Sequence, residues 1–216
     1  MNPHITQLGR DYPDIEVCLP DVEKALGLIG SAFYAKNRLL VCGNGGSAAD
    51  ADHIVGELLK GFLLKRPLSE SQQQRLKIAY PDHGSYLATN LQEGLPAVNL
   101  CAHTALATAF SNDVAPDLVF AQQVHVYGRP GDILIGISTS GRSANVLHAL
   151  RVARMNGIHT VGLTGKSGGE MAAVTDVLIK VPYDQTPRIQ ERHLPIYHAL
   201  CVALEDGFFG TNAKAS

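Results

Sequence analysis

Residues 39–57 read LLVCGNGGSAADADHIVGE, and this stretch determines how the rest of the chain is interpreted. Its first four residues are apolar, which is typical of a short buried strand. The glycines that follow permit a tight turn and a close approach to a ligand, because glycine has no Cβ. Ser47 stands where a helix N-cap belongs, with Asp50 three residues later. The stretch therefore predicts a strand, a turn and a helix whose free N–H groups suit a phosphate or a sugar oxygen.

The predicted helix also carries His53 and Glu57, which are four residues apart and therefore share one face. A histidine and a glutamate at this spacing are common as a solvated surface pair. A glycine-rich turn is likewise found in many α/β proteins that bind nothing there. The choice between a surface pair and a functional pair therefore depends on the remainder of the chain.

The composition is that of an ordinary globular protein and not of a disordered one. The chain has 216 residues, 45% hydrophobic and 18% charged, which is enough for one sizeable α/β domain. Its formal net charge of −2 gives no electrostatic reason to expect a nucleic acid or an anionic membrane as a partner. A bound phosphate would therefore need local backbone and hydroxyl groups.

The cysteines and the apolar segments indicate the compartment. The four cysteines are scattered without a CxxC pair, which predicts free, core-packed thiols in a reducing environment; they are Cys18, Cys42, Cys101 and Cys201. No basic segment followed by an apolar run begins the chain, and no apolar stretch reaches the roughly 18 residues that span a bilayer. We expect a soluble, cytoplasmic protein.

Strand and helix signals alternate along the chain. Strands are expected at residues 39–42, 97–101, 132–137, 159–163 and 176–181. Helices are expected at residues 20–37, 47–59 (extending as far as 62), 104–110, 119–127, 144–156 and 188–208, with residues 1–19 irregular or weakly helical. This order predicts a single domain over residues 1–216, with an N-terminal helical segment over about 1–37. Its parallel sheet lies between helices, and its ligand binds beyond the C-terminal ends of the strands.

Residues 65–93 form an insertion in this pattern. The segment is polar and is interrupted by Pro67, Pro81 and Gly84, and residues 69–78 could form a short helix. A long segment of this kind is more often functional or part of an interface than an idle linker. Nothing in it resembles a second domain.

A second turn, STSGRS at residues 138–143, follows the strand at 132–137 and opens the next helix. Hydroxyls at a helix N-terminus suit a phosphate monoester, although an ordinary N-cap would need only one or two of them. The hydroxyls are those of Ser138, Thr139, Ser140 and Ser143. Neither glycine-rich turn has the spacing of a Walker A loop or of GxGxxG.

The last helix carries Gln190, His193 and His198 within the segment RIQERHLPIYH. At helical spacing Gln190 and His198 lie on neighbouring faces, and His193 lies between them in the sequence. A single histidine in an apolar helix is usually a hydrogen-bonded core or surface residue. The residues alone do not decide between His193 and His198 as a functional imidazole.

Five motifs in this order resemble the phosphoheptose isomerases, members of the sugar-isomerase (SIS) domain superfamily. The motifs are CGNGGSAADADHIVGEL, SNDVAPDLVFAQQV, GDILIGISTSGRSANVLHAL, VGLTGKSGG and TPRIQERHLPIYH. The resemblance extends over about residues 20–208. It implies a flavodoxin-like parallel sheet sandwiched between helices and a homotetramer with active sites near subunit interfaces.

The resemblance also implies roles for individual residues. Glu57 and His198 match the acid–base pair, and His193 matches a position without a catalytic role. The substrate- and phosphate-binding positions would be Asn44, Gly45, Ser47, Asp113, Ser138, Thr139, Ser140, Ser143 and Gln190. A zinc site reported for some members would fall on His53, Glu57, Gln190 and His198.

The implied reaction converts sedoheptulose 7-phosphate to D-glycero-D-manno-heptose 7-phosphate through an enediol. A carboxylate and an imidazole suit the two proton transfers near neutral pH, and zinc could polarise the carbonyl. Glu57 cannot be a tight zinc ligand and a free base at the same instant, and it stays open which of the pair is the base.

Other readings stay open beside this one. Non-catalytic relatives that bind a replication initiator lack the glutamate and the last-helix histidine, both of which are present here. A sugar-phosphate-sensing module of a regulator would be accompanied by a DNA-binding segment, and none accompanies it here. The chain also departs from the family: residues 65–93 exceed the usual loop, Gly61 and its neighbours replace a common arginine, and Pro187 replaces an aspartate of some members. A different sugar phosphate could therefore be the substrate.

Overall fold

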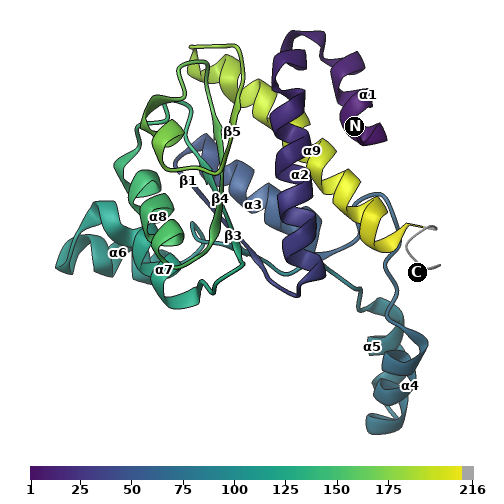
Figure 1. Cartoon of the computed structure of the whole chain (residues 1–216). Helices are drawn as coiled ribbons and strands as arrows, with labels where there is room; N and C mark the ends of the chain where they lie inside the picture. The colour runs from purple at the N-terminus through teal and green to yellow at the C-terminus, as the bar shows by residue number, and fades with distance from the viewer. Residues whose placement is uncertain (211–216) are drawn as a thin grey trace.

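The computed structural model describes residues 1–210 (Figure 1), so the last six residues of the predicted domain 1–216 lie outside the described part. The helices are α1 Pro3–Asp11, α2 Leu19–Tyr34, α3 Gly46–Leu59, α4 Glu70–Ala79, α5 Gly84–Asn90, α6 Thr104–Asp113, α7 Val119–Tyr127, α8 Ala144–Met155 and α9 Thr186–Phe209, with 3-10 turns at Pro13–Cys18, Pro116–Leu118 and Gly169–Ala173. The strands are β1 Leu39–Gly43, β2 Ala97–Asn99, β3 Ile133–Ile137, β4 His159–Thr164 and β5 Val177–Lys180.

The five strands form one parallel sheet in the order β2-β1-β3-β4-β5. This order is that of flavodoxin-like folds, so the predicted fold class is confirmed. The chain leaves β1 for the edge strand β2 and returns to β3 on the other side of β1. The ends of β1 and β3 are therefore neighbours, with Gly43 paired in register with Ile137. Ligands of such sheets bind at this switch point.

Helices cover both faces of the sheet (Figure 1). Side chains of α1, α2, α3 and α9 pack on one face, and those of α7 and α8 pack on the other. Strand β1 contributes Leu39 and Val41 to the first cluster and Leu40 and Cys42 to the second. Burial on both faces explains why the strands are continuously apolar instead of alternating.

The N-terminal segment is more helical than predicted. The side chain of Asn2 accepts a hydrogen bond from His4 N at 2.9 Å, and Pro3 occupies the first turn of α1. An asparagine cap followed by proline is a favourable helix start, because proline has the required φ and its missing N–H would be unpaired there. The prediction of an irregular or weakly helical segment over residues 1–19 was therefore wrong.

Several element ends also differ from the prediction. Helix α2 ends at Tyr34 and not at residue 37, and Lys36 has a positive φ of 65°, which lies outside the helical region. Strand β2 ends at Asn99, whose side-chain oxygen accepts a hydrogen bond from Cys101 N at 2.8 Å and turns the chain. Helix α6 continues to Asp113 and does not end near Phe110. Helix α3 ends at Leu59, because the next residue is extended and the chain then turns toward α9.

The insertion at residues 65–93 forms a pair of packed helices, α4 and α5, that projects from the body (Figure 1). A capping box of Ser69 and Gln72 starts α4, and a bridge between Pro67 and Gln92 joins the base of the pair. Within residues 1–210 no helix combines the length and the apolar character that a bilayer crossing requires.

Candidate active site

The first switch-point turn leads from β1 into α3, and its N-cap is Gly45 instead of the predicted Ser47. Gly45 has a φ of 56°, which glycine adopts without strain, and its carbonyl oxygen accepts from Ala48 N at 3.0 Å. Ser47 lies inside the first turn of α3 and is 4% exposed. No side chain caps the start of this helix. The serine prediction was wrong because the glycine already turns the chain one residue before the helix begins.

The second switch-point turn comprises residues 138–143, here called the serine turn. Ser143 is the N-cap of α8, but its hydroxyl lies 2.9 Å from the Ser138 hydroxyl and does not cap the helix. Ser140 Oγ accepts a hydrogen bond from Arg142 N, and the backbone oxygen of Thr139 accepts from Gly165 N. The hydroxyls of the two bonded serines are therefore held together at the start of α8, where Ser143 does not cap the helix and Asn145 Oδ1 accepts from Val146 N at 3.0 Å.

A pair of asparagines joins the two turns. Asn44 and Asn145 exchange side-chain hydrogen bonds, each 2.9 Å long. This pair fixes the starts of α3 and α8 beside each other, and uncapped helix starts present N–H groups and partial positive charge to an anion. Asn145 was missed by sequence analysis, since an asparagine in a first helical turn gives no local sign of a partner 101 residues away.

Gln190, in the first turns of α9, lies over the start of α3. A Cβ on residue 46 would come 2.5 Å from Gln190 Nε2, so Gly46 is required for this close approach. The amide of Gln190 is thus beside the first switch-point turn. This position agrees with its predicted place near the substrate-binding residues.

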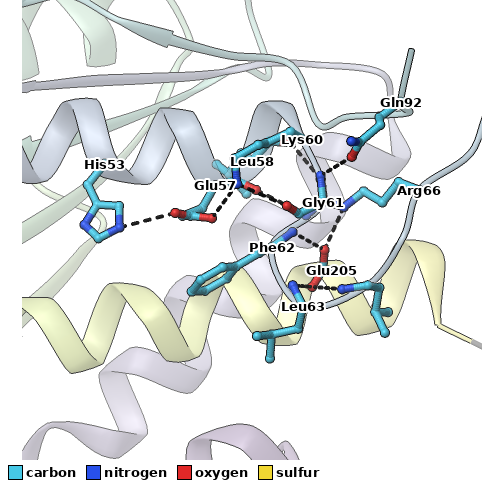
Figure 2. Close-up of polar contacts among 11 residues, drawn as sticks. His53, Glu57, Leu58, Lys60, Gly61, Phe62, Leu63, Arg66, Gln92 and Glu205 are labelled. Carbon is cyan, nitrogen blue, oxygen red and sulfur yellow. Dashed lines mark hydrogen bonds and ion pairs between the residues drawn. The ribbon is translucent and has the colours of Figure 1, made fainter. Parts of the chain in front are cut away.

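A second group of side chains lies farther along α3 and comprises His53, Glu57 and His198, here called the acid–base group. His53 Nε2 lies 3.3 Å from Glu57 Oε1 (Figure 2), and the rings of His53 and His198 are 4.9 Å apart between centroids. The Glu57 side chain is 14% exposed, and Lys60 Nζ lies 3.4 Å from its other oxygen. Helices α3 and α9 therefore bring together a carboxylate and two imidazoles.

Tyr197 of α9 holds the ring of His53 in one orientation. The Tyr197 hydroxyl lies 3.0 Å from His53 Nδ1 and donates a hydrogen bond to Asp50 Oδ1 at 3.3 Å. Burial raises the pKa of Asp50 above its usual value, although the Tyr197 hydrogen bond opposes this shift. Burial also raises the pKa of Tyr197, which therefore stays protonated. This series of hydrogen bonds, from Asp50 through Tyr197 to His53, resembles the outer hydrogen bonds that hold functional imidazoles in one orientation.

His198 of α9 is the third member of the acid–base group. Burial and the neighbouring His53 lower its pKa, while Glu57 acts in the opposite direction. Its Nε2 is buried and, within residues 1–210, has no hydrogen-bond partner. A lowered pKa keeps the ring neutral near pH 7, so that this nitrogen is ready to accept or return a proton.

The structure also separates His198 from His193, which the residues alone could not do. His193 is wholly buried, and its Nε2 lies 3.4 Å from the carbonyl oxygen of Thr164 at the end of β4. Burial lowers the pKa of His193 to about 4. His193 is therefore a neutral core histidine, and His198 is the one beside Glu57.

The first switch-point turn and the acid–base group lie at different ends of α3. From Gly46 to Glu57 the helix rises about 16 Å, at about 1.5 Å per residue. Asp113 belongs to neither group: it is exposed at the end of α6, where its carboxylate accepts a hydrogen bond from the Asn112 side chain at 2.8 Å.

The predicted zinc ligands fit the metal in donor type but not in spacing. His53, Glu57 and His198 supply imidazole and carboxylate donors, and the unpaired Nε2 of His198 is a free one. Across residues 1–210, however, no three His, Cys, Asp or Glu side chains are grouped as metal ligands. Gln190 lies at the other end of α3, beside Gly46. The zinc site stays a prediction.

Comparison with known proteins identifies the family. The SIS domain family model matches residues 77–165. The phosphoheptose isomerase of Rhodospirillum rubrum is 40% identical over 189 residues, which are 88% of this chain and 87% of the relative. The phosphoheptose isomerase of Trichlorobacter lovleyi is 41% identical over 197 residues, 91% of this chain and 87% of the relative.

Solved structures agree with these relatives. A phosphoheptose isomerase from Neisseria gonorrhoeae superposes with a TM-score of 0.73 at 34% identity, covering 94% of this chain and 95% of its own. One from Francisella tularensis gives a TM-score of 0.75 at 30% identity, covering 93% and 92%. The resemblance stated from the five sequence motifs is confirmed. The chain belongs to the phosphoheptose isomerase family of SIS-domain proteins.

Proposed function

We propose that this protein isomerises sedoheptulose 7-phosphate to D-glycero-D-manno-heptose 7-phosphate through an enediol. The observation that carries the proposal is the meeting of Glu57 and His198, 141 residues apart, around His53. Relatives at 40% and 41% identity over most of the chain carry the name phosphoheptose isomerase. The chemistry requires a carboxylate and an imidazole that can exchange protons with adjacent carbons and oxygens.

Binding begins at the two switch-point turns. The uncapped starts of α3 and α8 offer N–H groups to the phosphate, and the hydroxyls of Ser138 and Ser143 rotate to donate to its oxygens. Gln190 and Asn44 border the same turns and suit contacts with sugar hydroxyls. No basic side chain is needed, because helix N-termini and hydroxyls supply the positive ends of the dipoles.

The reaction moves hydrogen from C1 to C2 of the ketose. One group removes a proton from C1 to form the enediol, and a proton is then returned at C2, while O1 and O2 exchange theirs. Glu57 and His198 divide these transfers. His53, held by Tyr197, keeps the Glu57 carboxylate in place. The lowered pKa of His198 favours a neutral ring, which can take up a proton and give it back within one turnover.

A complete site is shared between copies of the chain. An extended seven-carbon sugar phosphate measures about 9 Å from C1 to phosphorus, at about 3.5 Å per three bonds. About 16 Å of α3 lies between Gly46 and Glu57, which is more than the length of the substrate alone, although the Glu57 side chain and the hydrogen bonds at both ends shorten this gap. In the homotetramer that the family resemblance implies, we infer that the serine turn of one copy lies beside the acid–base group of another. Light scattering would give the molar mass of the assembly, and a monomeric active enzyme would contradict this arrangement.

Zinc belongs to the same proposal. His53, Glu57 and His198 would hold the ion, which would polarise the substrate carbonyl. Gln190, the fourth ligand in the family pattern, lies beside Gly46 at the other end of α3 and does not reach the same ion in this chain. Elemental analysis of the purified protein measures the metal directly. A protein without zinc that gains neither bound zinc nor activity on its addition would contradict this part. A cytoplasmic location accords with the four free thiols.

Binding of a replication initiator without catalysis is not favoured. The non-catalytic relatives lack the glutamate and the last-helix histidine, whereas Glu57 and His198 lie beside His53 here. The test is to incubate the purified chain with a panel of ketose phosphates and to follow aldose product. We expect turnover of sedoheptulose 7-phosphate in preference to shorter ketose phosphates. Turnover of none of them would overturn the proposal, and turnover of another one alone would correct the substrate.

A further inference from the structure

A buried ion pair lies next to the acid–base group and is formed by Arg66 and Glu205. Arg66 Nε donates to Glu205 Oε1 at 2.8 Å, and the side chains are 0% and 1% exposed. Burying two charges costs more than a well-packed apolar pair of similar volume would, so stability alone does not account for the pair. Neither residue belongs to the predicted site, although both lie close to Glu57 and the loop after α3 (Figure 2).

Arg66 ends helix α3 by binding its last carbonyl groups. Its Nη1 donates to the carbonyl oxygen of Leu58 at 2.8 Å, and its Nη2 donates to that of Glu57 at 3.2 Å. Helix ends leave such carbonyls without partners inside the helix, and α3 has no glycine C-cap, since the residue after it, Lys60, is extended with a φ of −138°. Leu95 N also donates to the Leu58 carbonyl, at 2.9 Å, whereas Arg66 adds the bond to that of Glu57. The guanidinium therefore holds the backbone of the residue that carries the acid–base carboxylate.

Glu205 holds the loop that follows α3. Its carboxylate accepts hydrogen bonds from Phe62 N at 2.8 Å, Leu63 N at 2.7 Å and Leu64 N at 3.1 Å (Figure 2 labels the first two). Burial opposes the charge of Glu205, but these bonds and Arg66 outweigh it, so that its pKa lies below the usual value. The carboxylate is thus ionised, and both of its oxygens accept hydrogen bonds.

The same loop reaches His198. The Phe62 ring packs on the His198 ring, with 5.4 Å between centroids, and Glu205 lies seven residues after His198 on α9. One end of the pair thus fixes the backbone of Glu57, and the other fixes the ring that packs on His198. Both halves of the acid–base group therefore depend on the same buried pair.

We propose that Arg66 and Glu205 are positioning residues of the isomerase site: they fix the end of α3 and the loop 61–64, so that Glu57 and His198 face the substrate in one geometry. The proposal rests on the proposed function. Loss of such positioning displaces reacting groups without touching the phosphate-binding turns, which lie about 16 Å away along α3. It therefore lowers kcat and leaves KM nearly unchanged.

The test compares Arg66→Lys and Glu205→Gln with the parent enzyme. Lysine keeps the charge but cannot bind Glu205 and two carbonyl groups together in a planar fork. We expect kcat to fall about 10- to 100-fold with KM within about twofold, because displacements near 1 Å cost this much. Folded variants with parental kcat, or with only KM raised, would overturn the proposal.

Asp132→Asn is the matched control for Glu205→Gln. Asp132 is another buried carboxylate that accepts backbone bonds, from Arg38 N at 3.0 Å and Arg129 N at 2.9 Å, and it ion-pairs with Arg38. It lies just before β3, at the edge of the sheet opposite the turns. We expect it to lower the thermal midpoint and to keep parental kcat. If equal losses of stability gave equal losses of kcat, a purely structural role would explain both.

A double variant, Arg66→Met with Glu205→Met, separates folding from positioning further. The two methionines remove both buried charges together, so that neither charge is left unpaired, but they also remove the acceptor of the N–H groups of residues 62–64. We expect a low kcat at temperatures where the variant is fully folded. Recovery of kcat together with stability would contradict the proposal.

Amide hydrogen exchange distinguishes failure of this inference from failure of the proposed function. In Arg66→Lys we expect faster exchange at residues 61–64 and unchanged exchange at the serine turn. An inactive parent enzyme would overturn the proposed function, and unchanged exchange at residues 61–64 would overturn the positioning role whether or not the parent is active.

Discussion

The serine turn and the acid–base group are built in different ways. The serine turn consists of consecutive residues at one strand–helix junction, and its contacts, such as that between Ser138 and Ser143, are local. The acid–base group needs two helices, α3 and α9, to pack in one register before Glu57 and His198 meet. The conformation of the serine turn is determined by a few consecutive residues, whereas the geometry of the acid–base group depends on the packing of the whole core.

This difference predicts a division of labour that kinetics can separate. Changes in the serine turn should alter KM, because they affect a binding interaction present in ground state and transition state alike. Changes in the acid–base group should alter kcat, because proton transfer occurs only in the transition state. A serine-turn substitution that altered mainly kcat, or an acid–base substitution that altered mainly KM, would contradict this division.

The largest expected effect is that of Glu57→Gln. The amide keeps the shape of the side chain but cannot take up a proton, so kcat should fall about 10²- to 10⁴-fold with substrate affinity retained. Steady-state kinetics and calorimetric titration measure the two quantities. Glu191→Gln, an equally conservative change at an exposed site on α9, is the control and should be silent. Activity that survives in Glu57→Gln would remove Glu57 from the mechanism.

His198→Asn should lower kcat about 100-fold, since it removes the second proton carrier and leaves the serine turn intact. Its KM should stay near the parental value. The acid limb of the parental kcat/KM profile should lie below the usual histidine pKa, because burial and His53 lower the pKa of His198 in the free protein. A pH profile recorded between 5 and 8 tests this, and a rise of KM alone in the variant would argue for a binding role instead.

His193 should affect stability and not catalysis. Its pKa is about 4 in the folded chain and about 6.5 when unfolded, so the unfolded chain binds the extra proton between these values. Stability is therefore complete above pH 6.5 and is lost as the pH falls toward 4, by up to about 3 kcal/mol.

Denaturant titrations of the parent and of His193→Gln at pH 7 and pH 4.5 measure this contribution. The difference in unfolding free energy between the two pH values should be smaller in the variant. An equal difference in both proteins would show that another group causes the loss.

The smallest expected effect is that of Ser143→Ala. Loss of one hydrogen bond to a charged phosphate costs about 1.5 kcal/mol, so KM should rise about tenfold with kcat unchanged. Ser71→Ala, on the projecting helix α4, is the control and should change neither constant. A fall of kcat in Ser143→Ala would mean that the serine turn also takes part in the chemistry.

The parts of the molecule that were predictable from sequence are those with local signals. The apolar runs predicted all five strands, and the turns at Gly43 and Ser138 were placed correctly at the C-terminal edge. The cap of α3 was missed because Gly45 and Ser47 both suit the position, and only backbone conformation separates them. Helix α1 was missed although Asn2 and Pro3 signal its start.

The parts that could not be predicted depend on distant pairs. Nothing in the residues around Asn44 indicates Asn145, and nothing around Arg66 indicates Glu205. His193 and His198 are equivalent in local sequence, and only the packing of α9 buries one beneath the sheet and turns the other toward His53. Such choices are made by tertiary structure and leave no short-range pattern.

Helix α9 carries Gln190, His198 and Glu205 along 24 residues. A single-residue insertion or deletion within this helix rotates everything after it by about 100°. Removal of one residue between Gln190 and His198 would keep the amide over Gly46 while the later two side chains swung away from α3 together. Evolution of this segment is therefore restricted in length as well as in composition. The segment can accept substitutions, but it cannot accept insertions or deletions without separating these side chains.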